Sequence, residues 1–157
     1  MKVFFPPNPY KPDGCYTVFL AGSIEMGKAE DWQERFIQHW SGSSRHVNIL
    51  NPRRHEWDAS WEQSIENTEF RGQVEWELAG LARADLILMY IQPDTLSPIS
   101  MLELGLFADS GKMVVCCPAG FWRKGNIDIV CHNRNIIHCE TEKELYRISD
   151  NFIMRLA

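Results

Sequence analysis

The chain has 157 residues, 45% of them hydrophobic and 24% charged, which is typical of one globular domain with its own core. The net charge of -5 at pH 7 argues against binding the backbone of DNA or RNA, because that function needs a basic face. No secretory signal segment and no apolar run near the ~20 residues of a membrane span is present. We therefore expect a single cytoplasmic domain over residues 1–157, without a membrane partner.

Five short apolar runs, bounded by turn residues, predict β-strands. Because these runs are continuous rather than alternating, we expect strands that are buried on both faces. In chain order, the predicted strands span Tyr16–Ala21, Val47–Leu50, Leu86–Ile91, Met113–Cys117 and Asn135–Cys139.

Helical patterns lie between most of these runs. The predicted helices span Lys28–Trp40, Arg71–Arg83, Pro98–Ser110 and Thr141–Leu156. Strands that alternate with helices predict an α/β fold, with a doubly wound, five-stranded, mostly parallel sheet and helices on both faces, similar to the flavodoxin and Rossmann folds. In such folds ligands bind outside the carboxyl ends of the strands, so the loops that follow the strands are the segments to examine for function.

The cysteines predict neither a metal site nor a redox cofactor. Their number is odd, and they show no Cys-x-x-Cys pair and no Cys/His spacing that would bind a metal. They are expected to be reduced thiols of a cytosolic protein: Cys15, Cys116, Cys117, Cys131 and Cys139.

Glu103 is the most informative residue of the sequence. On its predicted helix it shares one face with three apolar residues that we expect to meet the sheet: Ile99, Leu102 and Leu106. A carboxylate on that face loses hydration unless it is paired or lines a cavity. Two helix starts remain open. Ser100 as the N-cap would make Glu103 a capping-box residue, whereas Ser97 as the N-cap, with Pro98 at the first position, places Glu103 in the second turn.

Glu77 repeats this pattern one helix earlier, on a face shared with Val74, Leu78 and Leu81. Two acids that point inward from sequential helices can share one pocket. Paired carboxylates suit glycoside chemistry, because one attacks the sugar carbon while the other handles a proton. We therefore expect both carboxylates to open into one cavity. The alternative for Glu77 is a partly exposed acid in a salt bridge.

Two loops are candidates for ligand binding. The first begins at Gly22, Ser23 and Ile24, and its small residues let backbone N–H groups approach an anion; the alternative is an ordinary strand–helix turn. The second, NPRRHEW at 51–57, combines arginines suited to phosphate with a tryptophan that can stack on a base; the alternative is a solvated charged loop. Trp57, with Trp61 and Phe70, forms either a lid or a satellite core.

At these positions the chain resembles the nucleoside 2-deoxyribosyltransferase family, including its relatives that hydrolyse nucleotide N-glycosidic bonds. The resemblance is carried by residues 18–24 (VFLAGSI), 82–94 (ARADLILMYIQPD) and 97–115 (SPISMLELGLFADSGKMVV). It implies that Glu103 is the nucleophile and that Glu77 lies near the position of an acid that contacts the base. Candidate substrate-binding residues are then Gly22, Ser23, Ile24, Asn51, Arg53, Arg54, Trp57, Ser97 and Met101.

The sequence departs from the transferase pattern at several positions. Phe19 replaces a tyrosine near the nucleophile, Ser97 replaces an aspartate that binds the sugar 5′-hydroxyl, and NPRRHEW is not part of the pattern. A serine at position 97 resembles the phosphate-binding hydrolases. These changes, with the arginines, lead to the hypothesis that nucleoside 5′-monophosphates are preferred, provided that the Glu25 carboxylate points away from the phosphate.

The sequence therefore predicts an enzyme that cleaves the N-glycosidic bond of a (deoxy)nucleoside or nucleoside 5′-monophosphate. A glutamyl-glycosyl intermediate would be resolved by a base or by water, without a metal or another cofactor. The resemblance also implies a homo-oligomer with a small-molecule substrate, while the net charge of -5 argues against polymeric nucleic acid. Two alternatives stay open: a nucleotide-binding or sensing module without turnover, and a structural α/β domain in which Glu103 only caps its helix.

Overall fold

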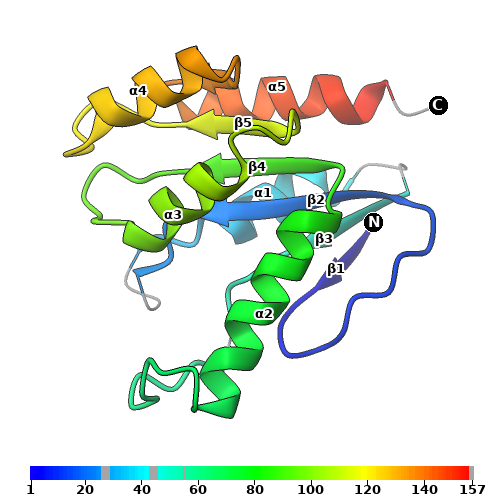
Figure 1. The fold of residues 1–157 in the computed structure, drawn as a ribbon. Helices are drawn as coiled ribbons and strands as arrows, with labels where there is room; N and C mark the ends of the chain where they lie inside the picture. Colours follow the sequence, from blue (N-terminus) through cyan, green and yellow to red (C-terminus); the bar gives the residue numbers. More distant parts are fainter. Residues whose placement is uncertain (26–28, 43–45, 55, 156–157) are drawn as a thin grey trace.

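The computed structural model describes residues 1–25, 29–42, 46–54 and 56–155. Within these ranges six strands form one parallel sheet in the order β1-β3-β2-β4-β5-β6 (Figure 1). The strands are β1 (Lys2–Phe4), β2 (Tyr16–Gly22), β3 (Val47–Leu50), β4 (Leu86–Tyr90), β5 (Met113–Cys116) and β6 (Ile137–Cys139).

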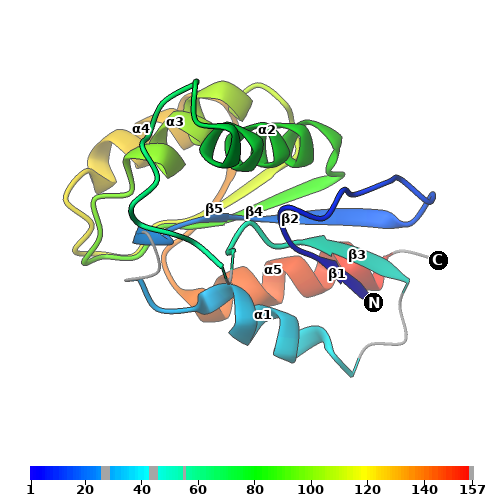
Figure 2. The same ribbon diagram turned by 90° about the horizontal axis from the view of Figure 1, so that it is seen from below.

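Helices cover both faces of the sheet (Figure 2). One face packs against α2 (Thr68–Arg83), α3 (Pro98–Phe107) and α4 (Lys124–Asn133), and the other against α1 (Trp32–Trp40) and α5 (Glu142–Met154). This arrangement confirms the doubly wound α/β fold. In the described ranges, no helix is both long and apolar enough to cross a membrane.

The strand order places a topological switch between β2 and β4. After β2 the chain adds β3 on one side, and after α2 it returns to add β4 on the other side. Ligands bind at such switch points in open α/β sheets. The loops that start at Ser23 and Gln92 meet there, and they carry the hydroxyl groups of the candidate site.

Local signals explain most of the elements. The inner strands are almost wholly buried, as their continuous apolar runs predict. Trp32, Phe36 and Trp40 form the buried stripe of α1. Thr141 and Glu144 form the predicted capping box of α5. Predicted ends of the later helices and strands differ from the observed ones by at most three residues, while the predicted start of α1 at Lys28 lies outside the described residues.

The structure corrects the strand count. β1 is a sixth strand, parallel to β3 at the sheet edge. Only three residues pair before Pro6 and Pro7, which is too short a run to distinguish from a loop in the sequence. The second addition is α4, part of which was expected to be loop. Its N-cap, Arg123, makes no side-chain capping bond, and its buried residues are only Ile127 and Cys131, so it lacks the signals of a helix start.

The orientation of α3 also differs from the prediction. Ile99, Leu102 and Leu106, expected to face the sheet, are 59%, 58% and 59% exposed. The buried residues of the helix are instead Ser100, Glu103 and Leu104. Glu103 does face inward, but the apolar stripe beside it is turned outward. A correction of the same kind applies to Leu78 on α2, which is 39% exposed while Leu81 is fully buried.

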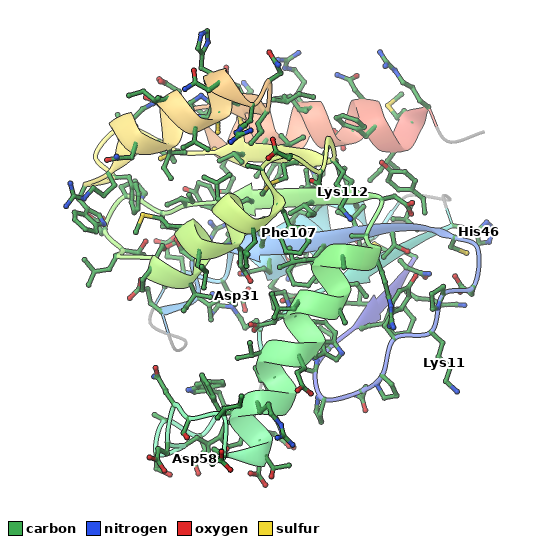
Figure 3. All side chains as sticks on the ribbon, in the orientation of Figure 1. Lys11, Asp31, His46, Asp58, Phe107 and Lys112 are labelled. Atoms are coloured by element: carbon green, nitrogen blue, oxygen red, sulfur yellow. The ribbon has the colours of Figure 1, made fainter. Side chains whose placement is uncertain are left out.

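The junction between α2 and β5 is held by a lysine. Lys112 Nζ donates hydrogen bonds of 2.8 Å to the carbonyl oxygens of Ala82 and Ala84 at the C-terminal end of α2. A cation at this end of a helix also interacts favourably with its dipole. Figure 3 labels Lys112 beside that helix end and Asp58 at the opposite end, where the segment between β3 and α2 projects beyond the N-terminus of α2. Lys112 thus anchors the C-terminal end of α2 to the start of β5.

Candidate active site

The backbone at the start of α3 decides the position of Glu103. Ser97 is the N-cap, Pro98 occupies the first helical position, and the Ser97 side chain makes no capping bond. The capping-box reading based on Ser100 is therefore wrong, and Glu103 lies in the second turn. Its residue is 8% exposed, and no described residue donates a hydrogen bond to it or pairs with it as a cation. Burying a carboxyl without a partner costs free energy, so a residue of this kind calls for a functional explanation.

Glu77 faces the same region from α2. Its Oε1 accepts a 2.7 Å hydrogen bond from Gln73 Nε2, and Gln73 Nε2 also donates to the carbonyl oxygen of Pro52 at 3.0 Å. Gln73 is 5% exposed, and its own Oε1 has no hydrogen-bond partner among the described residues. Gln73 thus fixes the Glu77 carboxyl relative to the loop that follows β3.

The two carboxyls influence each other electrostatically. Burial, and then the charge of Glu77, raise the pKa of Glu103 to about 8. Burial also raises the pKa of Glu77 to about 7, although the hydrogen bond from Gln73 opposes this rise. Two desolvated acids without a cation retain one proton between them near neutral pH. This protonation state is typical of catalytic acids rather than of structural ion pairs.

A cluster of hydroxyl groups lies at the carboxyl edge of β2 and β4. Ser23 Oγ is 2.6 Å from Ser97 Oγ and 3.0 Å from Thr95 Oγ1, and Thr95 Oγ1 is 2.7 Å from Ser97 Oγ. The Gln92 N–H donates to Ser23 Oγ at 2.8 Å. The structure therefore brings Ser23 and Ser97 together as expected. Thr95 was missed because a threonine in a loop has no distinguishing sequence pattern.

Gly22 has a structural explanation of its own. Its φ is +125°, and a Cβ at this position would lie 2.1 Å from the carbonyl oxygen of Tyr90. The next N–H, that of Ser23, donates to the same oxygen at 2.9 Å. Glycine is required because β2 and β4 approach closely at this point. A role of Gly22 or of Ile24 in ligand binding stays a prediction, as does that of Met101, which packs against the core below α3.

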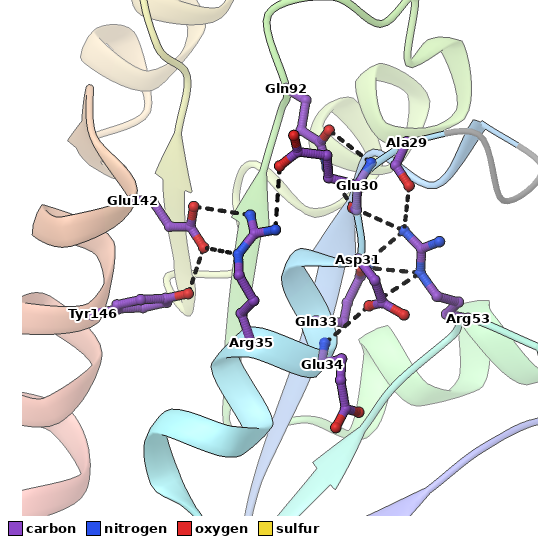
Figure 4. A network of polar contacts seen from close by, with 10 residues as sticks. All are labelled: Ala29, Glu30, Asp31, Gln33, Glu34, Arg35, Arg53, Gln92, Glu142 and Tyr146. Atoms are coloured by element: carbon purple, nitrogen blue, oxygen red, sulfur yellow. Dashed lines mark hydrogen bonds and ion pairs between the residues drawn. The ribbon is translucent and has the colours of Figure 1, made fainter.

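Arg53 is engaged within the protein. Its Nη2 donates to the carbonyl oxygens of Ala29 and Glu30 at 3.3 and 3.1 Å, and its Nε lies 3.3 Å from Asp31 (Figure 4). Asn51, whose Oδ1 accepts from the Arg53 N–H at 3.0 Å, shapes this turn. Both residues thus connect the loop after β3 to the start of α1, and the interactions of Arg53 do not leave it as a free phosphate ligand.

Arg54 and Trp57 belong to a small cluster beside α2. The Arg54 guanidinium lies 4.7 Å from the ring centre of Trp61, and the rings of Trp57 and Trp61 are 5.2 Å apart. Arg54 Nε and Trp57 Nε1 are buried without hydrogen-bond partners among the described residues. His55, between them, lies outside the described residues. This packing favours the satellite-core interpretation of the aromatic segment.

A cavity of about 440 Å³ opens at the same edge of the sheet. Its lining residues come from the loops after β2 and β4: Glu25, Ala29, Glu30, Tyr90, Gln92, Pro93, Asp94 and Thr95. Neither Glu77 nor Glu103 lines it, so this cavity is not the shared one that we expected for the two acids. Among the described residues, no group of three or more His, Cys, Asp and Glu side chains is placed to hold a metal ion.

Comparison with known proteins agrees with the fold and shows the family. Residues 15–121 match the family described as nucleoside 2-deoxyribosyltransferase like, whose members are generally glycosyl-transfer enzymes. The fold is similar to the crystal structure of a conserved protein from Enterococcus faecalis V583, with a TM-score of 0.59 and 10% identity over 85% of this chain and 96% of that one. No curated protein matches the sequence. Because the family match spans more than half of its residues, the chain belongs to the nucleoside 2-deoxyribosyltransferase-like family.

Proposed function

We propose that residues 1–157 form one enzyme domain that cleaves the N-glycosidic bond of a nucleoside, with Glu103 as the nucleophile. The observation that carries this proposal is the buried Glu103 carboxyl, which feels the charge of the half-buried Glu77 and has no cationic partner among the described residues. Membership of a family of glycosyl-transfer enzymes supports the same chemistry.

In the proposed reaction the Glu103 carboxylate attacks C1′ of the sugar, forming a C–O bond as the C1′–N bond breaks. Glu77 gives its proton to the departing base, directly or through water. The glycosyl-glutamate ester is then resolved by a second base or by water, with overall retention of configuration. Transfer and hydrolysis differ only in the group that enters at this second step.

The position of the shared proton must change during this reaction. In the unliganded protein the hydrogen bond from Gln73 stabilises the ionised form of Glu77, so the proton favours Glu103. Positive charge that develops at C1′ stabilises the ionised form of Glu103, because opposite charges a few ångströms apart interact strongly in a desolvated site. We propose that substrate binding thereby transfers the proton to Glu77.

We also propose a homo-oligomer in a reducing, cytoplasmic compartment. The outward face of α3 exposes the apolar side chains of Ile99, Leu102 and Leu106, a surface that a second copy would cover. All five cysteines are free thiols, as expected where disulfides do not form. Sedimentation of the protein with Leu102→Glu should show smaller particles than the unmodified protein, and identical sedimentation would contradict the proposal.

The test of the activity is incubation with a panel of nucleosides and their 5′-monophosphates, with and without an acceptor base. Free or exchanged base is measured by chromatography. We expect base release that is lost in Glu103→Gln. It should be kept in Glu142→Gln, a control that makes the same substitution at a partly exposed acid on the opposite face. Ligand-dependent stabilisation of the unmodified protein without any base release would instead support the second candidate, a nucleotide-binding module without turnover.

A further inference from the structure

The first loop places a carboxylate on the N-terminus of α3. Glu25 Oε1 accepts hydrogen bonds from the Ser97 N–H at 2.6 Å and from the Leu96 N–H at 3.1 Å. Free N–H groups at a helix N-terminus are the groups that bind a phosphate in many proteins. In this protein an acidic side chain already occupies the N–H of the N-cap, Ser97, and the N–H of Leu96 before it. The condition for a phosphate site, that Glu25 points away, is therefore not met.

The charges around the Glu25 carboxylate also disfavour the binding of a phosphate. Glu25 lines the cavity together with Glu30 and Asp94, and no described residue that lines it is a cation. The guanidinium of Arg53 is held by Asp31 and by backbone carbonyls, and that of Arg54 stacks on Trp61. A phosphate at the start of α3 would thus meet carboxylates without a compensating charge from the described lining.

Glu25 binds the residue that begins the helix carrying the proposed nucleophile. Glu103 follows Ser97 by six positions, and this spacing corresponds to roughly 9 Å along the axis of α3. A sugar whose C1′ contacts Glu103 can direct its 5′ substituent towards Ser97 over such a span. An uncharged hydroxyl there can donate to the carboxylate of Glu25, whereas a phosphate is repelled by it.

We propose that Glu25 is a specificity residue that makes the enzyme select nucleosides over nucleoside 5′-monophosphates. This inference rests on the proposed function, since it concerns the 5′ end of the same substrate. It reverses the preference for monophosphates that Ser97 and the arginines predicted, because the N–H groups of Leu96 and Ser97 donate to Glu25 rather than to a ligand.

The kinetic test compares kcat/KM for a 2′-deoxynucleoside and its 5′-monophosphate. A carboxylate about 5 Å from a phosphate charge at an effective dielectric of ~20 corresponds to roughly 300-fold discrimination. We expect the unmodified enzyme to prefer the nucleoside by about that factor, and Glu25→Gln, which keeps a hydrogen-bond acceptor without the charge, to reduce the preference at least ~10-fold. Glu34→Gln, an exposed acid on α1, should leave it unchanged. Equal values for both substrates, or a preference for the monophosphate, in the unmodified enzyme would overturn the inference.

A second measurement does not depend on turnover. Inorganic phosphate should raise the melting temperature of Glu25→Ala, in which the N–H groups of Leu96 and Ser97 are open, but not that of the unmodified protein or of Glu34→Ala. If no variant releases a base, the proposed function fails, and phosphate stabilisation confined to Glu25→Ala still supports the role of Glu25. The same phosphate response in all three proteins, or none in Glu25→Ala, would refute that role.

Discussion

Glu142 lies on the opposite face of the sheet from Glu77 and Glu103, and its surroundings are opposite to theirs. On the α1/α5 face, Glu142 accepts hydrogen bonds from Arg35 at 3.1 and 3.0 Å and another from Tyr146, and Arg35 also pairs with Glu30 at 3.2 Å (Figure 4). On the α2/α3 face, Glu103 has no described partner, and Glu77 has only the amide of Gln73.

This difference distinguishes a structural acid from the two acids that we propose to be functional. A paired carboxylate stays ionised and holds two elements together, at little net gain or cost near the surface. Two unpaired, desolvated carboxyls have raised pKa values and destabilise the folded state at alkaline pH. A protein that keeps the second arrangement retains a reactive pair of acids, which is why we place the chemistry on the α2/α3 face.

The largest expected effect is that of Glu103→Ala. If Glu103 is the nucleophile, kcat/KM for base release should fall at least ~10³-fold, while the circular dichroism spectrum stays that of the folded protein. The matched change on the other face, Glu142→Ala, should alter kcat/KM by less than about threefold. Near-normal turnover by Glu103→Ala would remove the proposed mechanism.

Glu77→Gln should reduce kcat by roughly 10²- to 10³-fold, the usual contribution of a general acid. The loss should be much smaller for a substrate whose base leaves without protonation, because such a substrate does not need the proton of Glu77. Rates of base release from an ordinary nucleoside and from one with an activated leaving group measure this directly. The same loss for both substrates would show that Glu77 is not the acid.

The stability of the protein should depend on the proton of Glu103. Because the folded-state pKa of about 8 lies above the unfolded value of about 4.3, the folded state binds more protons than the unfolded state between these values, and stability falls as the pH rises through that window. Glu103→Gln removes this dependence. Urea unfolding measures the free energy of unfolding at pH 5 and at pH 9. Between these pH values it should decrease less in Glu103→Gln than in the unmodified protein, by on the order of 3 kcal/mol. Parallel pH dependences would show that Glu103 is not buried as an acid.

Gln73→Leu tests how Glu77 is held. With one proton on the acid pair, kcat/KM of the unmodified enzyme should be highest between about pH 7 and 8. Loss of the Gln73 hydrogen bond removes a stabilising donor from ionised Glu77, so its pKa should rise and the alkaline limb should move to higher pH. A lower rate with an unchanged pH profile would mean that Gln73 only supports the packing.

The smallest expected effect is that of Glu142→Gln on stability. The Glu142–Arg35 pair is partly exposed, with side-chain exposures of 24% and 41%, so its loss should cost only ~1 kcal/mol or less in the free energy of unfolding. Chemical denaturation at neutral pH measures it, and added salt should reduce the difference further. A cost of several kcal/mol would contradict the small contribution to stability that we expect from this pair.

Sequence patterns predicted much of the fold because strand burial and helix capping are local properties. The inner strands and the capping box of α5 follow from residues that are neighbours in the chain. β1 and α4 were missed for the complementary reason, since neither carries a strong local signal. Family resemblance indicated Glu103, and its inward direction was expected, but the apolar residues that were to accompany it face outward.

The sequence by itself determined the α/β class, the family and the two acids worth examining. Only the tertiary structure decided which face of α3 meets the sheet, because helical periodicity relates residues within one helix and not to a neighbour. Contacts between distant segments could not be predicted from the sequence either. Glu25 binds the amides of Leu96 and Ser97, and Arg53 pairs with Asp31 at the start of α1. These contacts determine the charge around the candidate site, and charge acts through space rather than along the chain.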